Sequence, residues 1–130
     1  MRLFHELVFD RFIEGATGFG GFTSKFMWDP VIGGVDTLRL MVVADHVSGT
    51  SVVLNIGVFE EPEVGTAPEN IPINSPLPNA PLTPGQVNIF NATLSDPNVP
   101  FSYGAFLWVS LNGTSPVAHV RIWATGRGRA

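Results

Sequence analysis

The chain has 130 residues, a size that predicts one domain with its own core. Its formal net charge of −4 argues against nucleic acid as a main partner. Only 14% of its residues are charged, and it contains no cysteine, which excludes disulfides and thiolate metal sites. With 14 glycines and 11 prolines, the composition predicts a single all-β domain over residues 1–130 whose weakly charged surface suits burial in an assembly.

Residues 1–14 are too apolar to remain unpacked, so we expect them to dock on the domain or on a neighbour. Their apolar positions fit either a helix with a broad apolar stripe or a strand. Phe4, Phe9 and Phe12 favour a strand, and no N-cap residue precedes the segment. We therefore predict a strand or extended N-terminal arm, with a short helix as the alternative.

The same segment differs from a secretory signal peptide. Glu6, Asp10 and Arg11 interrupt its apolar residues, and no small-residue cleavage site follows. No apolar run in the chain approaches the ~18 residues of a membrane span. We expect synthesis in the cytoplasm and no membrane partner.

Residues 15–34 combine six glycines with several aromatic side chains. The run Gly18–Gly21 superficially resembles a phosphate-binding loop, but it lacks the following Lys and Ser or Thr and does not open a helix. We interpret the segment as a bend that glycine permits and aromatic side chains anchor.

Two strand pairs with similar turns form the centre of the predicted fold. Residues 36–45 and 50–60 make the first pair, and residues 101–111 and 117–126, rich in β-branched and aromatic side chains, make the second. A Gly-Thr-Ser sequence lies between the members of each pair, preceded in the second by an Asn that completes a strong hairpin signal. We therefore predict two β-hairpins that form a pseudo-repeat in a two-layer sandwich.

The second predicted hairpin is apolar or aromatic on both faces, because side chains alternate along a strand. One face carries Phe101, Tyr103, Ala105, Leu107, Val109 and Leu111 on one strand and Ala118, Val120, Ile122 and Ala124 on the other. The other carries Phe106, Trp108, His119, Arg121 and Trp123. A small domain has one interior, so the second face is predicted to meet another layer or another subunit.

Residues 61–86 hold seven of the eleven prolines. Proline removes backbone donors, so we expect neither helix nor central strand there, and we predict a long extended arm over a surface, its own or a neighbour's. Residues 87–94 read as a strand whose apolar face changes midway, which predicts a bulge. The whole chain is predicted to be an antiparallel, jelly-roll-like β-sandwich of about seven to nine strands.

The sequence shows no catalytic constellation and implies no cofactor. His5, His46 and His119 lack metal-ligand spacing, so a metal site would need a three-dimensional coincidence with carboxylates. His119 is interpreted as a structural histidine, and Asp45 as a turn or cap residue. No serine lies in a Gly-x-Ser-x-Gly elbow. We expect a protein that is not an enzyme.

The pattern favours a self-assembling structural protein whose partners are its own copies or a capsid lattice protein. A two-sided apolar strand pair, low charge and long arms suit a shell better than a lone monomer. The residues predicted to contact another subunit are Phe4, Phe12, Ile71, Ile73, Leu77, Phe106, Trp108, His119, Arg121 and Trp123.

Residues 37–45, 48–51 and 117–127 resemble in style the small β-sandwich virion proteins of tailed bacteriophages, the head-decoration or cement type. The resemblance implies a non-enzymatic role in a virion, in which the chain binds a capsid lattice or its own copies, often as trimers. No functional residue carries over from that family.

A carbohydrate-binding module is the alternative function. Trp108, Trp123 and Phe106 could form a flat platform on which sugar rings stack. Hydrogen bonds would then come from His119, Arg121 and Asn112.

Overall fold

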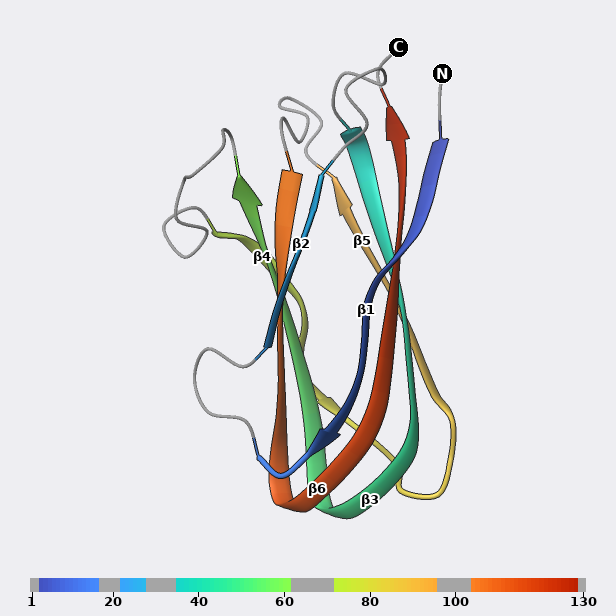
Figure 1. The fold of residues 1–130 in the computed structure, drawn as a ribbon, viewed down its shortest axis with the longest axis vertical. Coiled ribbons are helices and arrows are strands. Elements are labelled where there is room, and N and C mark those ends of the chain that lie inside the picture. Colours follow the sequence, from blue (N-terminus) through green and yellow to red (C-terminus); the bar gives the residue numbers. More distant parts are fainter. Residues whose placement is uncertain (1–2, 17–21, 28–34, 62–71, 96–103, 129–130) are drawn as a thin grey trace.

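The computed structural model of the chain describes residues 3–16, 22–27, 35–61, 72–95 and 104–128, shown as ribbon in Figure 1. All regular elements in these ranges are β-strands: β1 Leu3–Glu14, β2 Phe22–Met27, β3 Val35–Glu61, β4 Pro72–Pro81, β5 Asn88–Ser95 and β6 Gly104–Gly128. The pairings among these six strands are all antiparallel. The described residues contain no helix with the length and apolar character needed to cross a membrane.

The fold is built on one long ribbon of two paired strands. β3 and β6 have 27 and 25 residues and pair along almost their whole length. The register runs from Val35 opposite Gly128, through Thr50 opposite Thr114, to Glu61 opposite Gly104. Figure 1 shows that both strands bend at the same end of the molecule, so the ribbon folds back on itself.

The bend divides the sheet into two layers. The layer named here the β1 layer has the order β1, residues 117–128 of β6, residues 35–48 of β3, and β5. The β2 layer has the order β2, residues 104–112 of β6, residues 53–61 of β3, and β4. This arrangement of four segments in each layer is that of a jelly roll. The predicted all-β, jelly-roll-like antiparallel sandwich is confirmed, with six continuous strands forming eight segments in the described residues.

The core lies between the two layers and follows from the period-two alternation of the strands. The β1 layer contributes Ile13, Leu40, Val42, Ala44, Ala118, Val120, Ile122 and Ala124. The β2 layer contributes Leu54, Ile56, Val109 and Leu111. Each large aliphatic side chain buried this fully contributes about 1.5–3 kcal/mol to stability. The inward face predicted for the second strand pair is therefore confirmed over residues 109–124.

Both predicted hairpins are wrong. The two runs of β6 do not pair with each other, since Leu111 lies opposite Leu54 and Val117 lies opposite Ser48. The same holds for the two runs of β3. A Gly-Thr-Ser sequence provides exposed polar residues and left-handed backbone, which suit a corner between layers as well as a chain reversal within one sheet. The local signal therefore located the bends correctly and assigned the wrong partners.

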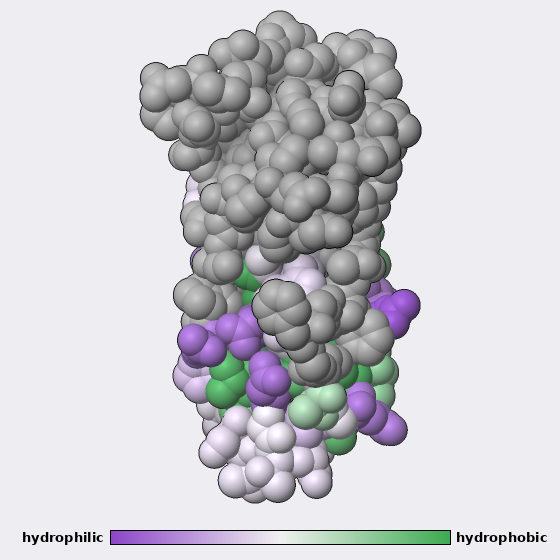
Figure 2. Space-filling view, turned by 90° about the vertical axis from the view of Figure 1, so that its left-hand side faces the viewer, coloured by the Kyte–Doolittle hydropathy of each residue, from purple (hydrophilic) through white to green (hydrophobic). Residues whose placement is uncertain are grey.

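The two Gly-Thr-Ser sequences meet at the bend. A Cβ added to Gly49 would lie 2.7 Å from the Ser115 carbonyl oxygen, and one added to Gly113 would lie 2.9 Å from the Ser51 carbonyl oxygen. Both glycines have positive φ, 113° and 138°. Glycine is required at these positions because the backbones of β3 and β6 touch where the ribbon turns. In Figure 2 this end of the molecule is pale, neither strongly hydrophilic nor strongly hydrophobic.

The N-terminal arm is a strand of its own sheet. β1 pairs with β6 from Leu3 opposite Arg127 to Glu14 opposite Val117, with a register shift between Leu7 and Phe9. The preferred strand is confirmed and the helical alternative is wrong. Within the predicted glycine bend, residues 22–27 form β2, while residues 17–21 and 28–34 lie outside the described residues.

Two further expectations need correction. Residues 72–81 of the predicted arm form β4, an edge strand on β3 with three register shifts, because an edge strand tolerates proline where a central strand does not. Residues 62–71 of that arm lie outside the described residues. The bulge predicted in residues 87–94 is absent, since β5 pairs with β3 in unbroken register from Asn88 to Ser95.

Gly113→Ala tests the contact at the bend. The new Cβ meets backbone atoms of β3 and sits on a left-handed residue, so we expect the free energy of unfolding to fall by roughly 2–3 kcal/mol in urea titrations. Gly85→Ala is the matched control, because Gly85 has φ 75° but no atom within 4 Å of its added Cβ. It should cost only about 1 kcal/mol, and an equal loss in the two variants would contradict the contact.

Candidate functional site

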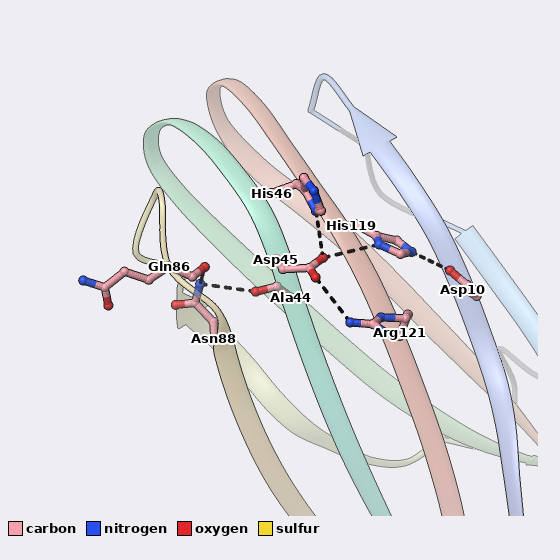
Figure 3. A network of polar contacts seen from close by, with 8 residues as sticks. All are labelled: Asp10, Ala44, Asp45, His46, Gln86, Asn88, His119 and Arg121. Atoms are coloured by element: carbon pink, nitrogen blue, oxygen red, sulfur yellow. Dashed lines mark hydrogen bonds and ion pairs between the residues drawn. The ribbon is translucent and has the colours of Figure 1, made fainter.

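A polar cluster lies on the outer face of the β1 layer, close to the bend (Figure 3). The register places Phe12 of β1 opposite His119 of β6, and His119 opposite Asp45 of β3. Two residues along each strand, Asp10 of β1 lies opposite Arg121 of β6. These side chains alternate with buried core residues and therefore point away from the interior.

Asp45 is the centre of the cluster. Its Oδ1 atom lies 3.2 Å from His46 Nδ1 and 3.3 Å from His119 Nδ1, and its Oδ2 atom lies 3.3 Å from an Arg121 terminal nitrogen. The Asp45 side chain is 20% exposed. Among the described residues, Oδ1 is buried without a partner in hydrogen-bond geometry, so the two ring nitrogens are near it but not aligned with it.

His46 reaches the cluster through an unusual backbone conformation. Successive residues of a strand normally point to opposite faces, and His46 follows Asp45 directly. Its φ of 52° breaks that alternation and brings the His46 ring beside the Asp45 carboxylate. A left-handed conformation costs a residue with a Cβ roughly 1–2 kcal/mol.

His119 joins the two carboxylates. Its Nε2 atom lies 2.6 Å from Asp10 Oδ1, and its Nδ1 atom faces Asp45. The rings of His46 and His119 are 6.3 Å apart, and the Phe12 ring lies 6.5 and 6.3 Å from them. Three rings from three elements therefore surround the charged centre.

The surroundings favour the ionised form of Asp45. Its pKa is lowered from the ordinary value of 3.8, first by the polar contact with His46. Burial opposes the shift, and electrostatic attraction to the side chains of Arg121, His46 and His119 adds to it. Asp45 is therefore a carboxylate at neutral pH.

Asn88 fixes the neighbouring turn against β3. Its Oδ1 atom accepts a hydrogen bond from the Thr83 backbone N–H at 2.8 Å, and its Nδ2 group donates to the Thr83 and Gln86 carbonyls at 3.1 and 3.0 Å. A longer contact of 3.4 Å joins Nδ2 to the carbonyl of Ala44, the residue before Asp45 (Figure 3). The side chain thus supports the strand that carries the cluster.

The residues predicted to contact another subunit lie on different parts of the fold. Phe12, His119, Arg121 and Trp123 gather on the outer face of the β1 layer, where the Arg121 guanidinium lies 5.6 Å from the Trp123 ring centroid. Phe4, Phe106, Ile73 and Leu77 lie in β1, β6 and β4, where the structure describes the backbone alone, and Ile71 lies outside the described residues.

The predicted sugar-binding platform does not form. Buried Val109 and Leu111 alternate with Trp108, which therefore faces outward from the β2 layer. Trp123 faces outward from the β1 layer, on the other side of the sandwich. The platform depended on a hairpin that would have placed both tryptophans in one sheet face.

Sequence reasoning missed the cluster itself. The sequence predicts a turn or cap role for Asp45 and a structural role for His119, and it assigns no role to Asp10. No local spacing reveals the group, because Asp10 and His119 are 109 positions apart and Asp45 and Arg121 are 76 apart. Asp45, His46 and His119 each offer one ligand atom, all within 4.8 Å of one another, so the group has the composition of a metal site.

No family model matches the chain, and a search of curated proteins finds no match. Among solved structures, the chain is similar to the VP2 subviral particle of infectious bursal disease virus, with a TM-score of 0.68 and 15% identity over 98% of this chain and 32% of that one. The Gt strain of that virus gives a TM-score of 0.67 and 16% identity over 98% and 33%. Its derived T=1 particles give 0.60 and 14% over 98% and 31%.

The chain thus spans about a third of the length of these viral proteins. At this identity, the likeness establishes the fold. The predicted resemblance to virus structural proteins holds at that level. The similar proteins come from infectious bursal disease virus and not from a tailed phage.

Asp45→Asn tests the charge at the centre of the cluster. A carboxylate whose folded pKa is lowered stabilises the fold above its unfolded pKa of 3.8, and that contribution is lost as pH falls through the folded value. We expect Asp45→Asn to unfold at lower urea than the parent at pH 7 in the presence of EDTA, and the difference to narrow below pH 3.8. Glu14→Gln, an exposed change on β1, should have little effect at either pH. A difference that is unchanged at pH 3 would contradict this role for the charge.

Proposed function

We propose that this chain is a non-enzymatic structural protein that assembles with copies of itself into a protein shell. The observation that carries the proposal is the likeness of its fold, over 98% of its length, to proteins whose structures were determined as virus particles. The location that follows from it is a virion or a similar protein shell.

The outer face of the β1 layer supports this proposal. Large apolar side chains remain exposed along it, with Leu7 45%, Phe12 55% and Ile89 61% exposed. Leu7 lies opposite Trp123 in the register, and Ile89 lies opposite Val43. Aromatic residues and arginine are enriched where proteins meet, and a face of this kind gains free energy when a second surface covers it.

Arg121 is already held in place for such a contact. Asp45 binds its guanidinium on one side, and the guanidinium lies over the Trp123 ring. A side chain that is ordered before binding loses less conformational entropy when a partner arrives. On this face we retain four of the predicted contact residues: Phe12, His119, Arg121 and Trp123.

The sheet edges are less suited to joining copies. β4 forms one edge of the β2 layer, and its prolines at 72, 76, 78 and 81 lack the backbone N–H that an added strand would need. β1 pairs with β6 of its own chain, so its backbone on that side is already used. We therefore propose that copies meet through faces, with trimers as one arrangement.

A decorating role on another shell, as in the phage proteins named above, is the finer alternative for the same face. We do not propose sugar binding, because Trp108 and Trp123 lie in different layers. The two assembly roles differ in what the isolated chain does, since a shell protein associates by itself and a decorating protein waits for its lattice.

Light scattering over a dilution series of the full chain tests self-assembly. We expect a trimer or a larger particle that dissociates on dilution, because the exposed apolar face is covered only in the assembly. A monomer mass at every concentration would contradict self-assembly, and binding of that monomer to a preformed capsid lattice would then indicate decoration.

Phe12→Ser and Ile89→Ser test the face. Both side chains are more than half exposed in the free chain, so the fold should survive, as circular dichroism can verify. We expect each variant to weaken association roughly tenfold or more, measured from the same dilution series. Asn112→Ser, an exposed change at the bend, is the control and should associate like the parent. Unchanged association in both face variants would place the contact elsewhere.

A further inference from the structure

We propose that Asp45, His46 and His119 form a binding site for a divalent transition metal ion, with Zn²⁺ as the best-fitting ion. The site lies on the outer face of the β1 layer (Figure 3) and is independent of the proposed assembly, since all its ligands come from one chain. The ligands are the Oδ1 atom of Asp45 and the Nδ1 atoms of the two histidines.

The three ligand atoms lie within 4.8 Å of one another, and two of their separations match those around one ion. The Asp45 oxygen lies 3.2 Å from one ring nitrogen and 3.3 Å from the other. Ligand atoms bonded to a tetrahedral Zn²⁺ at 2.0–2.1 Å are about 3.3–3.4 Å from each other. The Asp45 oxygen is buried and has no partner in hydrogen-bond geometry among the described residues, so the three atoms are close together without bonding directly to one another.

Asp10 selects the form of His119 that binds a metal. Its carboxylate lies 2.6 Å from Nε2 and can only accept there, so this contact favours the tautomer that has its proton on Nε2. Nδ1 then carries the lone pair and lies 3.3 Å from the Asp45 carboxylate, a distance at which two electron-rich atoms repel each other unless a positive charge lies close to both. A histidine that binds metal through one nitrogen and donates to a carboxylate from the other is a recurrent arrangement in metal sites.

The conformation of His46 places its ring for the same site. Its positive φ is unfavourable for a residue with a Cβ, and its result is to bring Nδ1 beside Asp45. The ring is 71% exposed, which leaves a path from solvent and room for water to complete the coordination. Phe12 lies beside both histidine rings, with ring centroids 6.5 and 6.3 Å away.

The charges of the cluster permit a cation. Asp10 and Asp45 carry two negative charges, and Arg121 carries one positive charge that contacts the other Asp45 oxygen, Oδ2. With neutral histidines the group has a net charge of −1, and Oδ1 stays available. Two imidazoles with one carboxylate favour Zn²⁺ and related ions over Ca²⁺ or Mg²⁺, which prefer oxygen ligands.

The test is metal binding by the purified full chain at pH 7.5. After EDTA treatment and dialysis, Co²⁺ serves as the spectroscopic probe, and Zn²⁺ binding is measured by calorimetry and by elemental analysis. We expect one ion per chain, with the strong visible bands of four-coordinate Co²⁺ that Zn²⁺ abolishes by displacement. A chain that binds neither ion overturns the proposal.

Three variants locate the ion. His46→Gln changes a largely exposed side chain and should leave the fold intact, while His119→Gln removes the second nitrogen. Both should weaken Zn²⁺ binding by more than the roughly 10- to 100-fold loss expected for Asp10→Asn, which removes only the outer partner of His119. The matched control is His5→Gln, because His5 lies on the same strand as Asp10 but hydrogen-bonds Thr125 at 2.6 Å.

His5→Gln should bind Zn²⁺ like the parent. Binding that persists in both His46→Gln and His119→Gln, or that is lost in His5→Gln, would overturn the assignment of the ligands. The assay does not depend on assembly, so a monomeric chain that binds one Zn²⁺ would support the site while contradicting the proposed self-association.

Discussion

The fold depends on a single close contact, where the backbones of β3 and β6 meet at Gly49 and Gly113. These two strands form one ribbon that contributes a central pair to each layer, so every other strand joins the sheet by pairing with one of them. Side chains at the contact would force the strands apart and open the bend. The two layers then could not face each other, and the shared core between them would be lost.

The same ribbon determines what lies on the surface. Its alternation buries small and branched aliphatic side chains and turns Asp45, His119, Arg121 and Trp123 outward. The cluster forms close to the bend because β1 adds Asp10 and Phe12 on one side and His46 leaves the regular strand conformation. The ordered polar cluster and the exposed apolar side chains therefore lie on the same face of the molecule. A metal ion there would hold the strands that present the apolar residues, while the apolar residues are the ones that gain from burial against a partner.

Much of the local structure could be predicted from the residues alone. Composition and alternation indicated an all-β sandwich, the inward side chains of residues 109–124, and a strand at residues 3–14. The two Gly-Thr-Ser sequences were recognised as related turns, and they are the two halves of the bend. Prolines in residues 72–81 correctly excluded a central strand, although they permit an edge strand with irregular register.

The sequence by itself determined the two-residue alternation of the strands, the face of each strand that is buried, and the places where the chain turns. These features depend on residues close together in the chain. Only the tertiary structure decided which strands pair, and the pairing decided the layer of each strand and the members of the polar cluster. A turn signal is the same whether the next strand returns beside its neighbour or crosses to another layer. His119 meets Asp10 across 109 positions, and Arg121 meets Asp45 across 76, so the cluster exists only once the register of β1, β6 and β3 is set. That register comes from packing the whole core, which no short segment encodes.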